Sequence, residues 1–66
     1  MEEINDVVIN NALEIIKIAY NCKIEDIKIL TKCCIDGIVR IKFQFKDDTE
    51  IYDFVMDKEV LENETI

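Results

Sequence analysis

Hydrophobic positions recur first at helical spacing and later at alternating spacing along this chain. Residues 2–21 contain neither Gly nor Pro, and their apolar residues return every three or four positions, which predicts a helix. The apolar arc of this helix covers roughly 240°, whereas a helix that lies on a single sheet needs only about 100°. The centre of the arc is formed by Ile4, Val8, Ala12, Ile15 and Ala19. We therefore expect one flank to be buried against something else, and Asn21 to end the helix in the left-handed conformation.

After Ile24 the period changes to two, which is typical of strands. Residues 25–34 form the first predicted strand, and residues 38–46 form the second. The expected inward sets are Ile27, Ile29, Thr31 and Cys33 in the first strand, and Val39, Ile41, Phe43 and Phe45 in the second. The expected outward sets are Lys28, Leu30, Lys32 and Cys34, and Arg40, Lys42 and Gln44.

Between these strands Asp36-Gly37 is a strong hairpin signal. A two-residue turn there would set Lys32 opposite Ile41 and so mix the two faces. A three-residue loop of residues 35–37, with Gly37 at a left-handed bulge position, keeps one face apolar. We therefore favour the longer loop. It pairs Cys33 with Val39, Thr31 with Ile41, and Ile29 with Phe43.

The third predicted strand covers residues 49–56 and follows a turn at Asp47-Asp48. This turn pairs Phe43 with Tyr52, Ile41 with Phe54 and Val39 with Met56, all inward, and sets Lys42 opposite Asp53. The same register leaves Leu30, Ile51 and Val55 on the outer face. Residues 57–66 are an acidic tail that could be a short helix, an added strand or a frayed end.

These elements predict one domain over residues 1–66, an α+β two-layer sandwich with an N-terminal helix packed on a three-stranded antiparallel meander. A chain of 66 residues has a small core, so the excess apolar surface favours a symmetric homodimer. The candidate self-association residues are Leu13, Ile18, Tyr20, Leu30, Ile51 and Val55. The alternative is a monomer in which Val60 and Leu61 fold back over the exposed helix flank.

Composition excludes most catalytic sites. The chain has no His, no Ser and one Gly, which rules out a Ser-His-Asp triad, a His-ligated zinc site and a glycine-rich phosphate loop. Cys22, Cys33 and Cys34 contain no Cys-x-x-Cys, and the adjacent pair points to opposite faces of a strand. We expect reduced thiols, no metal, no cofactor and no enzymatic activity.

Charge is concentrated near the C-terminus. Residues 1–22 carry a net −3, residues 23–46 a net +3 and residues 47–66 a net −7, which equals the net charge of the whole chain. The candidate partner-binding acids are Asp47, Asp48, Glu50, Asp53, Asp57 and Glu59. Strand carboxylates two residues apart are separated by about 6.6 Å, similar to the step between successive phosphates. We expect these acids to meet a basic protein partner; the alternative is a solvated edge and tail that only keeps a small protein soluble. We expect no direct binding of nucleic acid.

No family motif is present. In size, acidity and helix-plus-meander plan the chain resembles small inhibitors that phages and mobile elements encode against host nucleic-acid enzymes, including DNA-mimicking blockers of restriction systems and anti-CRISPR proteins. The resemblance implies a non-enzymatic inhibitor; the alternative is a structural or regulatory homodimer without such a target. The acidic start at Met1 and the lack of a long apolar run lead us to expect a cytoplasmic protein that does not enter membranes.

Overall fold

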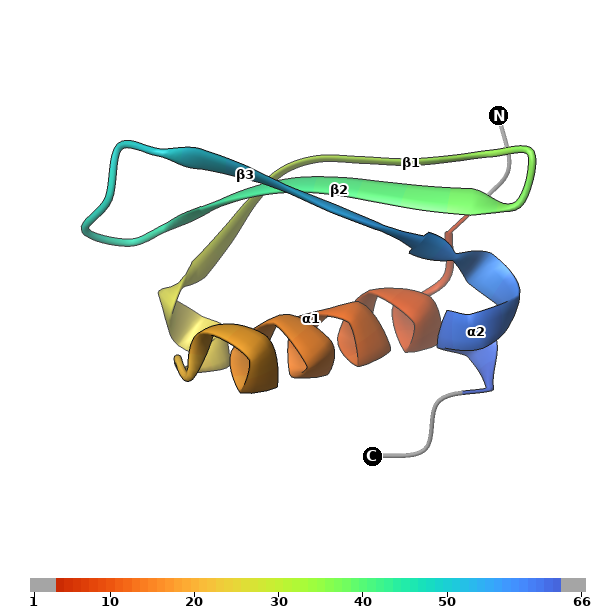
Figure 1. The fold of residues 1–66 in the computed structure, drawn as a ribbon, viewed down its shortest axis with the longest axis horizontal. Coiled ribbons are helices and arrows are strands. Elements are labelled where there is room, and N and C mark those ends of the chain that lie inside the picture. Colours follow the sequence, from red (N-terminus) through yellow and green to blue (C-terminus); the bar gives the residue numbers. More distant parts are fainter. Residues whose placement is uncertain (1–3, 64–66) are drawn as a thin grey trace.

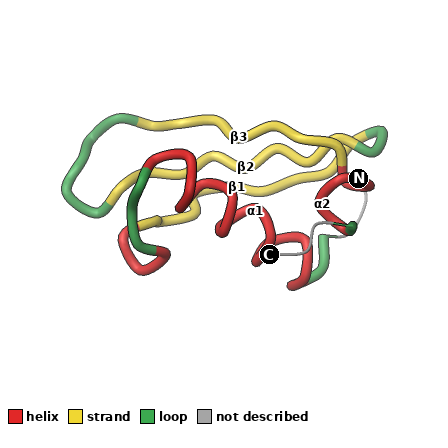
Figure 2. The backbone as a smooth tube through the Cα atoms, turned by 60° about the horizontal axis from the view of Figure 1, so that its bottom comes forward, coloured by secondary structure: helices red, strands yellow, loops and turns green. Residues whose placement is uncertain are grey.

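The computed structural model describes residues 4–63 and confirms the α+β fold. Two helices lie on one side of a three-stranded antiparallel sheet of order β1-β2-β3 (Figures 1 and 2). The elements are α1 (Asp6–Tyr20), a 3₁₀ turn η1 (Ile24–Asp26), β1 (Ile27–Ile35), β2 (Ile38–Phe45), β3 (Ile51–Asp57) and α2 (Lys58–Glu62). The opposite side of the sheet carries no layer among these residues (Figure 1).

Helix α1 is shorter than predicted because Asn5 caps its N-terminus. The Asn5 side chain accepts a hydrogen bond from the Val8 N–H at 3.0 Å, which satisfies one of the unpaired donors of the first turn. Residues 1–3 lie outside the described part of the chain. At the other end Asn21 adopts the left-handed conformation with φ 52° and ψ 52°, so the predicted helix end is confirmed.

The buried face of α1 is rotated from the predicted one. Its buried residues are Val8, Ile9, Ala12 and Ile16, whereas the predicted Ala19 is exposed and Ile15 is only half-buried. Val8, Ile9 and Ala12 join one core cluster with residues of the sheet and of α2, and the Asn11 side chain on the neighbouring flank donates a hydrogen bond to Leu61 of α2.

The β1–β2 hairpin corrects the predicted loop. Asp36 and Gly37 form a two-residue turn, with φ 54° and 76°, and Ile35 pairs with Ile38. Positive φ at both central positions is the type I′ geometry that suits the twist of two strands. The three-residue loop was therefore wrong.

A bulge at Leu30 resolves the mixing of faces that made the two-residue turn look unfavourable. Pairing runs Ile29–Phe43 and then Thr31–Lys42, so Leu30 is the extra residue and the facing of β1 reverses there. As a result Cys34 pairs with Val39 and is fully buried, while Cys33 lies on the outer face. The predicted pairs Cys33–Val39 and Thr31–Ile41 were wrong, whereas Ile29–Phe43 is confirmed.

The predicted β2–β3 register is confirmed. Phe43 pairs with Tyr52, Ile41 with Phe54, Val39 with Met56 and Lys42 with Asp53. The connection between the two strands is longer than predicted. The Asp48 N–H donates a hydrogen bond to the Phe45 carbonyl at 3.1 Å, which closes a turn, and β3 begins only at Ile51.

Helix α2 provides the second surface that the wide apolar arc of α1 required. Leu61 is fully buried in the cluster formed with α1 and the sheet, and its carbonyl accepts a hydrogen bond from the Asn11 amide at 2.6 Å. Val60 remains about half-exposed. Of the two tail residues that the monomer alternative folds back over the helix, Leu61 therefore does so and Val60 does not. Within residues 4–63, no helix has the length and apolar character needed to span a membrane.

Candidate protein-binding surface

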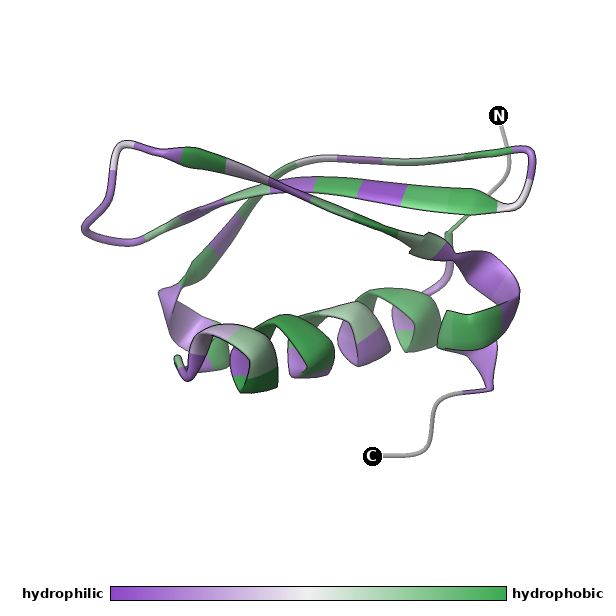
Figure 3. Cartoon of the chain, viewed as in Figure 1, coloured by the Kyte–Doolittle hydropathy of each residue, from purple (hydrophilic) through white to green (hydrophobic). Residues whose placement is uncertain are grey.

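The six predicted partner-binding acids do not form one patch. Asp47, Asp48 and Glu50 lie in the β2–β3 loop at one end of the sheet, and Asp57 and Glu59 lie at the other end, where β3 passes into α2. Asp53 lies between them in the middle of β3. Figure 3 shows these two hydrophilic ends with the more apolar sheet and helix between them. We call Asp47, Asp48 and Glu50 the loop acids.

The loop acids include one carboxylate with a structural role. Asp48 accepts hydrogen bonds from the Glu50 backbone N–H at 2.9 Å and from the Tyr52 hydroxyl at 3.0 Å. These bonds stabilise its charged form and lower the pKa of Asp48 below its ordinary value of 3.8. The bond to Asp48 also raises the pKa of Tyr52, because the hydroxyl must keep its proton to donate. Asp48 therefore holds the loop, while Asp47 and Glu50 are exposed.

Four aromatic rings anchor this end of the sheet against α1. Tyr20, Phe43, Phe45 and Tyr52 lie with ring centroids 5.3 to 5.9 Å apart in every pair. Such edge-to-face and offset contacts are favourable. Tyr20, a predicted self-association residue, is thus engaged within the chain although about half of it is exposed.

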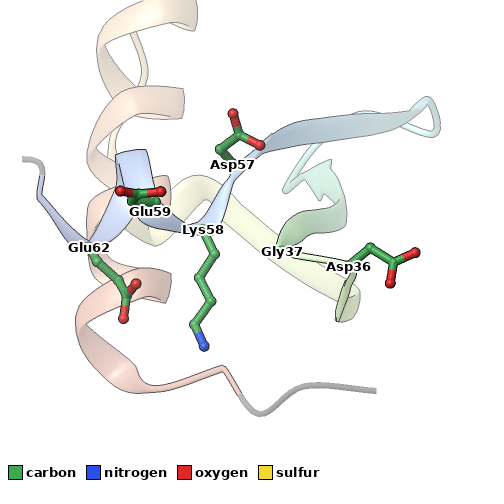
Figure 4. A pocket seen from close by; sticks show the side chains of 6 residues that line it. All are labelled: Asp36, Gly37, Asp57, Lys58, Glu59 and Glu62. Carbon is green, nitrogen blue, oxygen red and sulfur yellow. The ribbon is translucent and has the colours of Figure 1, made fainter.

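At the other end the fold gathers four acids from two segments. Asp36, from the β1–β2 turn, joins Asp57, Glu59 and Glu62 around a shallow hollow that Gly37 and Lys58 also line. We call these four the α2-end acids. In Figure 4 their carboxylates spread outward and do not converge on one point. This arrangement presents negative charge to a surface that approaches from outside.

Sequence reasoning missed Asp36 and Glu62 as members of this group. The contact depends on the Lys58 N–H, which donates to the Gly37 carbonyl at 2.8 Å and brings the turn against the start of α2. The predicted β2–β3 register already indicated this contact, because extending the register by two residues sets Gly37 opposite Lys58.

Asp53 is partly neutralised within the chain. Its carboxylate lies 4.0 Å from the Arg40 guanidinium, and both side chains are about half-exposed. Lys42 lies directly opposite Asp53 in the register, as predicted, but the observed ion pair is made with Arg40. An exposed pair at this distance contributes about 0 to 1 kcal/mol.

Aliphatic side chains are exposed on the open face of the sheet. The set is Leu30, Ile35, Ile38, Ile51 and Val55, with exposed fractions between 38% and 61%. Ile35 and Ile38 line a hollow with Cys33 and Arg40, next to the turn that carries Asp36. Sequence reasoning missed Ile35 and Ile38, because it assigned Ile35 to a loop and left Ile38 out of its faces.

The other predicted self-association residues lie on the helix. Ile18 is 67% exposed, whereas Leu13 packs against the core cluster and is less available to a partner.

The described residues show no group suited to hold a metal ion. Within residues 4–63, no set of three or more Cys, Asp or Glu side chains is placed for coordination. Cys22, Cys33 and Cys34 form no disulfide, and Cys34 is buried. The chemistry on this surface is therefore that of exposed carboxylates next to aliphatic side chains. No protein-family model, curated protein or solved structure matches the chain.

Proposed function

We propose that this chain is a non-enzymatic protein-binding module that blocks a basic, nucleic-acid-binding protein, as DNA-mimicking, anti-restriction and anti-CRISPR inhibitors do. The observation that carries this proposal is the group of α2-end acids beside exposed Ile35 and Ile38. An apolar centre with a charged rim is the usual anatomy of a protein interface. The concentration of negative charge would steer a basic partner toward it.

The cytoplasm is the proposed location. Support comes from Cys22, Cys33 and Cys34, which form no disulfide, as is typical of proteins in a reducing compartment.

Two variants in which carboxylates are replaced by neutral amides test the proposal. The first changes the α2 end by Asp57→Asn, Glu59→Gln and Glu62→Gln, and the second changes the loop by Asp47→Asn and Glu50→Gln. Each removes exposed charges only, and Asp48 is left intact because it holds the loop. Tagged wild-type and variant proteins are used to capture partners from a host lysate at low and high salt, with mass spectrometry as the readout.

We expect the wild type to capture a basic nucleic-acid-binding protein at low salt and to lose it at high salt. The α2-end variant should lose this partner, and the loop variant should keep it. Capture that is unchanged in the α2-end variant would contradict the assignment of this surface. Direct assays of the captured enzyme, with and without the chain, then test inhibition.

A second candidate function is a structural or regulatory homodimer without such a target. The observation that favours it is the row of aliphatic side chains on the open sheet face. Neutralising the α2-end acids should leave the mass of such a dimer unchanged, which separates the two functions.

A further inference from the structure

The outer edge of β3 has backbone groups available for pairing. The bond from the Lys58 N–H to the Gly37 carbonyl continues the β2–β3 ladder and shows which residues bond to β2. Because bonded and non-bonded positions alternate in an antiparallel pair, Tyr52, Phe54 and Met56 bond to β2. The N–H and C=O groups of Ile51, Asp53 and Val55 therefore point away from the sheet, as does the Asp57 N–H, whereas the Asp57 carbonyl belongs to the N-terminal cap of α2.

The two edges of the sheet differ in their protection. The β1 edge carries the Leu30 bulge, with Lys28 and Lys32 on either side, and bulges and lysines are devices that block pairing between edges. Strand β3 contains no bulge, Gly, Pro or Lys over its seven residues. Its inward side chains Tyr52, Phe54 and Met56 are also only half-buried, which leaves apolar surface beside the open edge.

In one register, β3 can pair with a second copy of itself without placing like charges directly opposite each other. With a two-fold axis at Phe54, the outward-pointing groups meet as Asp53 with Val55 and as Ile51 with Asp57. On the inner face Phe54 meets Phe54, and Tyr52 meets Met56, so every inner pair is apolar.

Neighbouring registers are unfavourable. An axis at Asp53 sets two Asp53 carboxylates opposite each other, and an axis at Val55 sets Asp53 opposite Asp57. An axis between two residues would pair outward-pointing backbone groups with inward-pointing ones, and the ladder would not form.

We propose that two copies of this chain join β3 to β3, antiparallel about Phe54, and form a continuous six-stranded sheet. Pairing of this kind is isologous, so each contact occurs twice. The same register brings the loop end of one copy toward the α2 end of the second, so the acids of the two ends repel each other and oppose the dimer.

Opposite charges at residue 55 provide the test. Val55 is about half-exposed on the outer face, so both Val55→Asp and Val55→Lys should be tolerated by the single chain. In the dimer Val55→Asp faces Asp53 of the second copy twice, whereas Val55→Lys forms two ion pairs with it. Sedimentation equilibrium from about 1 to about 200 µM, compared with the chain mass of 7.8 kDa, gives the dissociation constants.

We expect a wild-type mass of twice the chain mass at high concentration. Val55→Asp should weaken dimerisation by at least about tenfold, and Val55→Lys should keep or strengthen it. A wild-type mass of one chain at every concentration would overturn the proposal. Loss of the dimer in both variants would also overturn it, because contact through the outer sheet faces would then explain the result.

A proline pair tests the backbone separately. Val55→Pro removes an outward N–H from β3, and Lys32→Pro removes an outward N–H from the protected β1 edge, so neither removes a bond to β2. We expect only Val55→Pro to give a monomer, with circular dichroism confirming that both variants fold. Dimerisation through β3 does not depend on the proposed inhibitor function, because mass and partner capture are measured independently.

Discussion

Asp48 shows how one carboxylate can be a structural element in an acidic segment. Eight acids follow Lys46 in the sequence, and composition alone treats them as equivalent. Only the short distances to the Glu50 N–H and the Tyr52 hydroxyl identify Asp48 as the one that organises the β2–β3 loop.

Asp48 should therefore contribute a pH-dependent part of the stability. Its folded-state pKa lies below the unfolded value of 3.8, so the contribution is present above pH 3.8 and is lost as the pH falls through the folded value. Asp48→Asn should be destabilising at neutral pH and should show a smaller loss of stability in acid than the wild type. Urea unfolding at several pH values checks this, with Asp47→Asn as the control. An equal effect of the two variants would contradict it.

At the scale of the element, β1 shows how a turn and a bulge compensate for each other. The two-residue turn at Asp36-Gly37 fixes the register near the hairpin. If this register continued without a bulge, the hydrophobic side chains at the start of β1 would lie on the outer face instead of the inner face. The extra residue Leu30 satisfies both requirements.

Deleting Leu30 should therefore leave the fold intact. Pairing would run from Ile29 to Thr31 without interruption, and no inward side chain of β1 would change face. We expect the melting temperature to stay within about 8 °C of the wild type, which corresponds to roughly 1 kcal/mol in a chain of this size. Deleting Asp53, which is also exposed on the outer face but lies in a strand without a bulge, should reverse the inward residues on one side and abolish folding. Thermal melts that show equal damage from both deletions would contradict this account of β1.

Helix α2 has five residues, yet it completes the core. Its Leu61 closes the flank of α1 that a single sheet cannot cover. Leu61→Ala should lower the free energy of unfolding by about 2 to 5 kcal/mol, because the side chain is fully buried. Val60→Ala, at an exposed position one residue earlier, should change it by less than about 0.5 kcal/mol. Chemical denaturation measures both, and similar values for the two would show that α2 does not pack as described.

For the whole molecule, salt should separate self-association from binding of a basic partner. Each chain carries a net charge of −7, so two copies repel each other, and screening should favour the dimer. Raising NaCl from about 0.05 M to about 0.5 M should lower the dissociation constant of the dimer roughly threefold to tenfold, whereas capture of a basic protein should weaken. Sedimentation equilibrium and pull-down on the same samples measure both. A dimer weakened by salt would argue against pairing of the backbone edge as its main contact.

The sequence by itself determined the features that depend on periodicity and parity within adjacent segments. These are the order and type of the main elements, the end of α1 at Asn21 and the β2–β3 register, in which an unbroken alternation on both strands admits one pairing. It also placed an unmet apolar flank on α1, without deciding whether the tail or a second chain would cover it.

The tertiary structure decided what depends on contacts between distant segments. Packing in three dimensions determines whether a bulge returns the hydrophobic side chains of β1 to the inner face. It also determines whether Leu61 reaches the flank of α1 and whether Asp36 lies near Glu62. The same holds for the unequal edges of the sheet: only the strand order shows that β3, without bulge or lysine, lies at an open edge. Local spacing carries no information about these features, because it does not specify which surfaces the folded chain leaves uncovered.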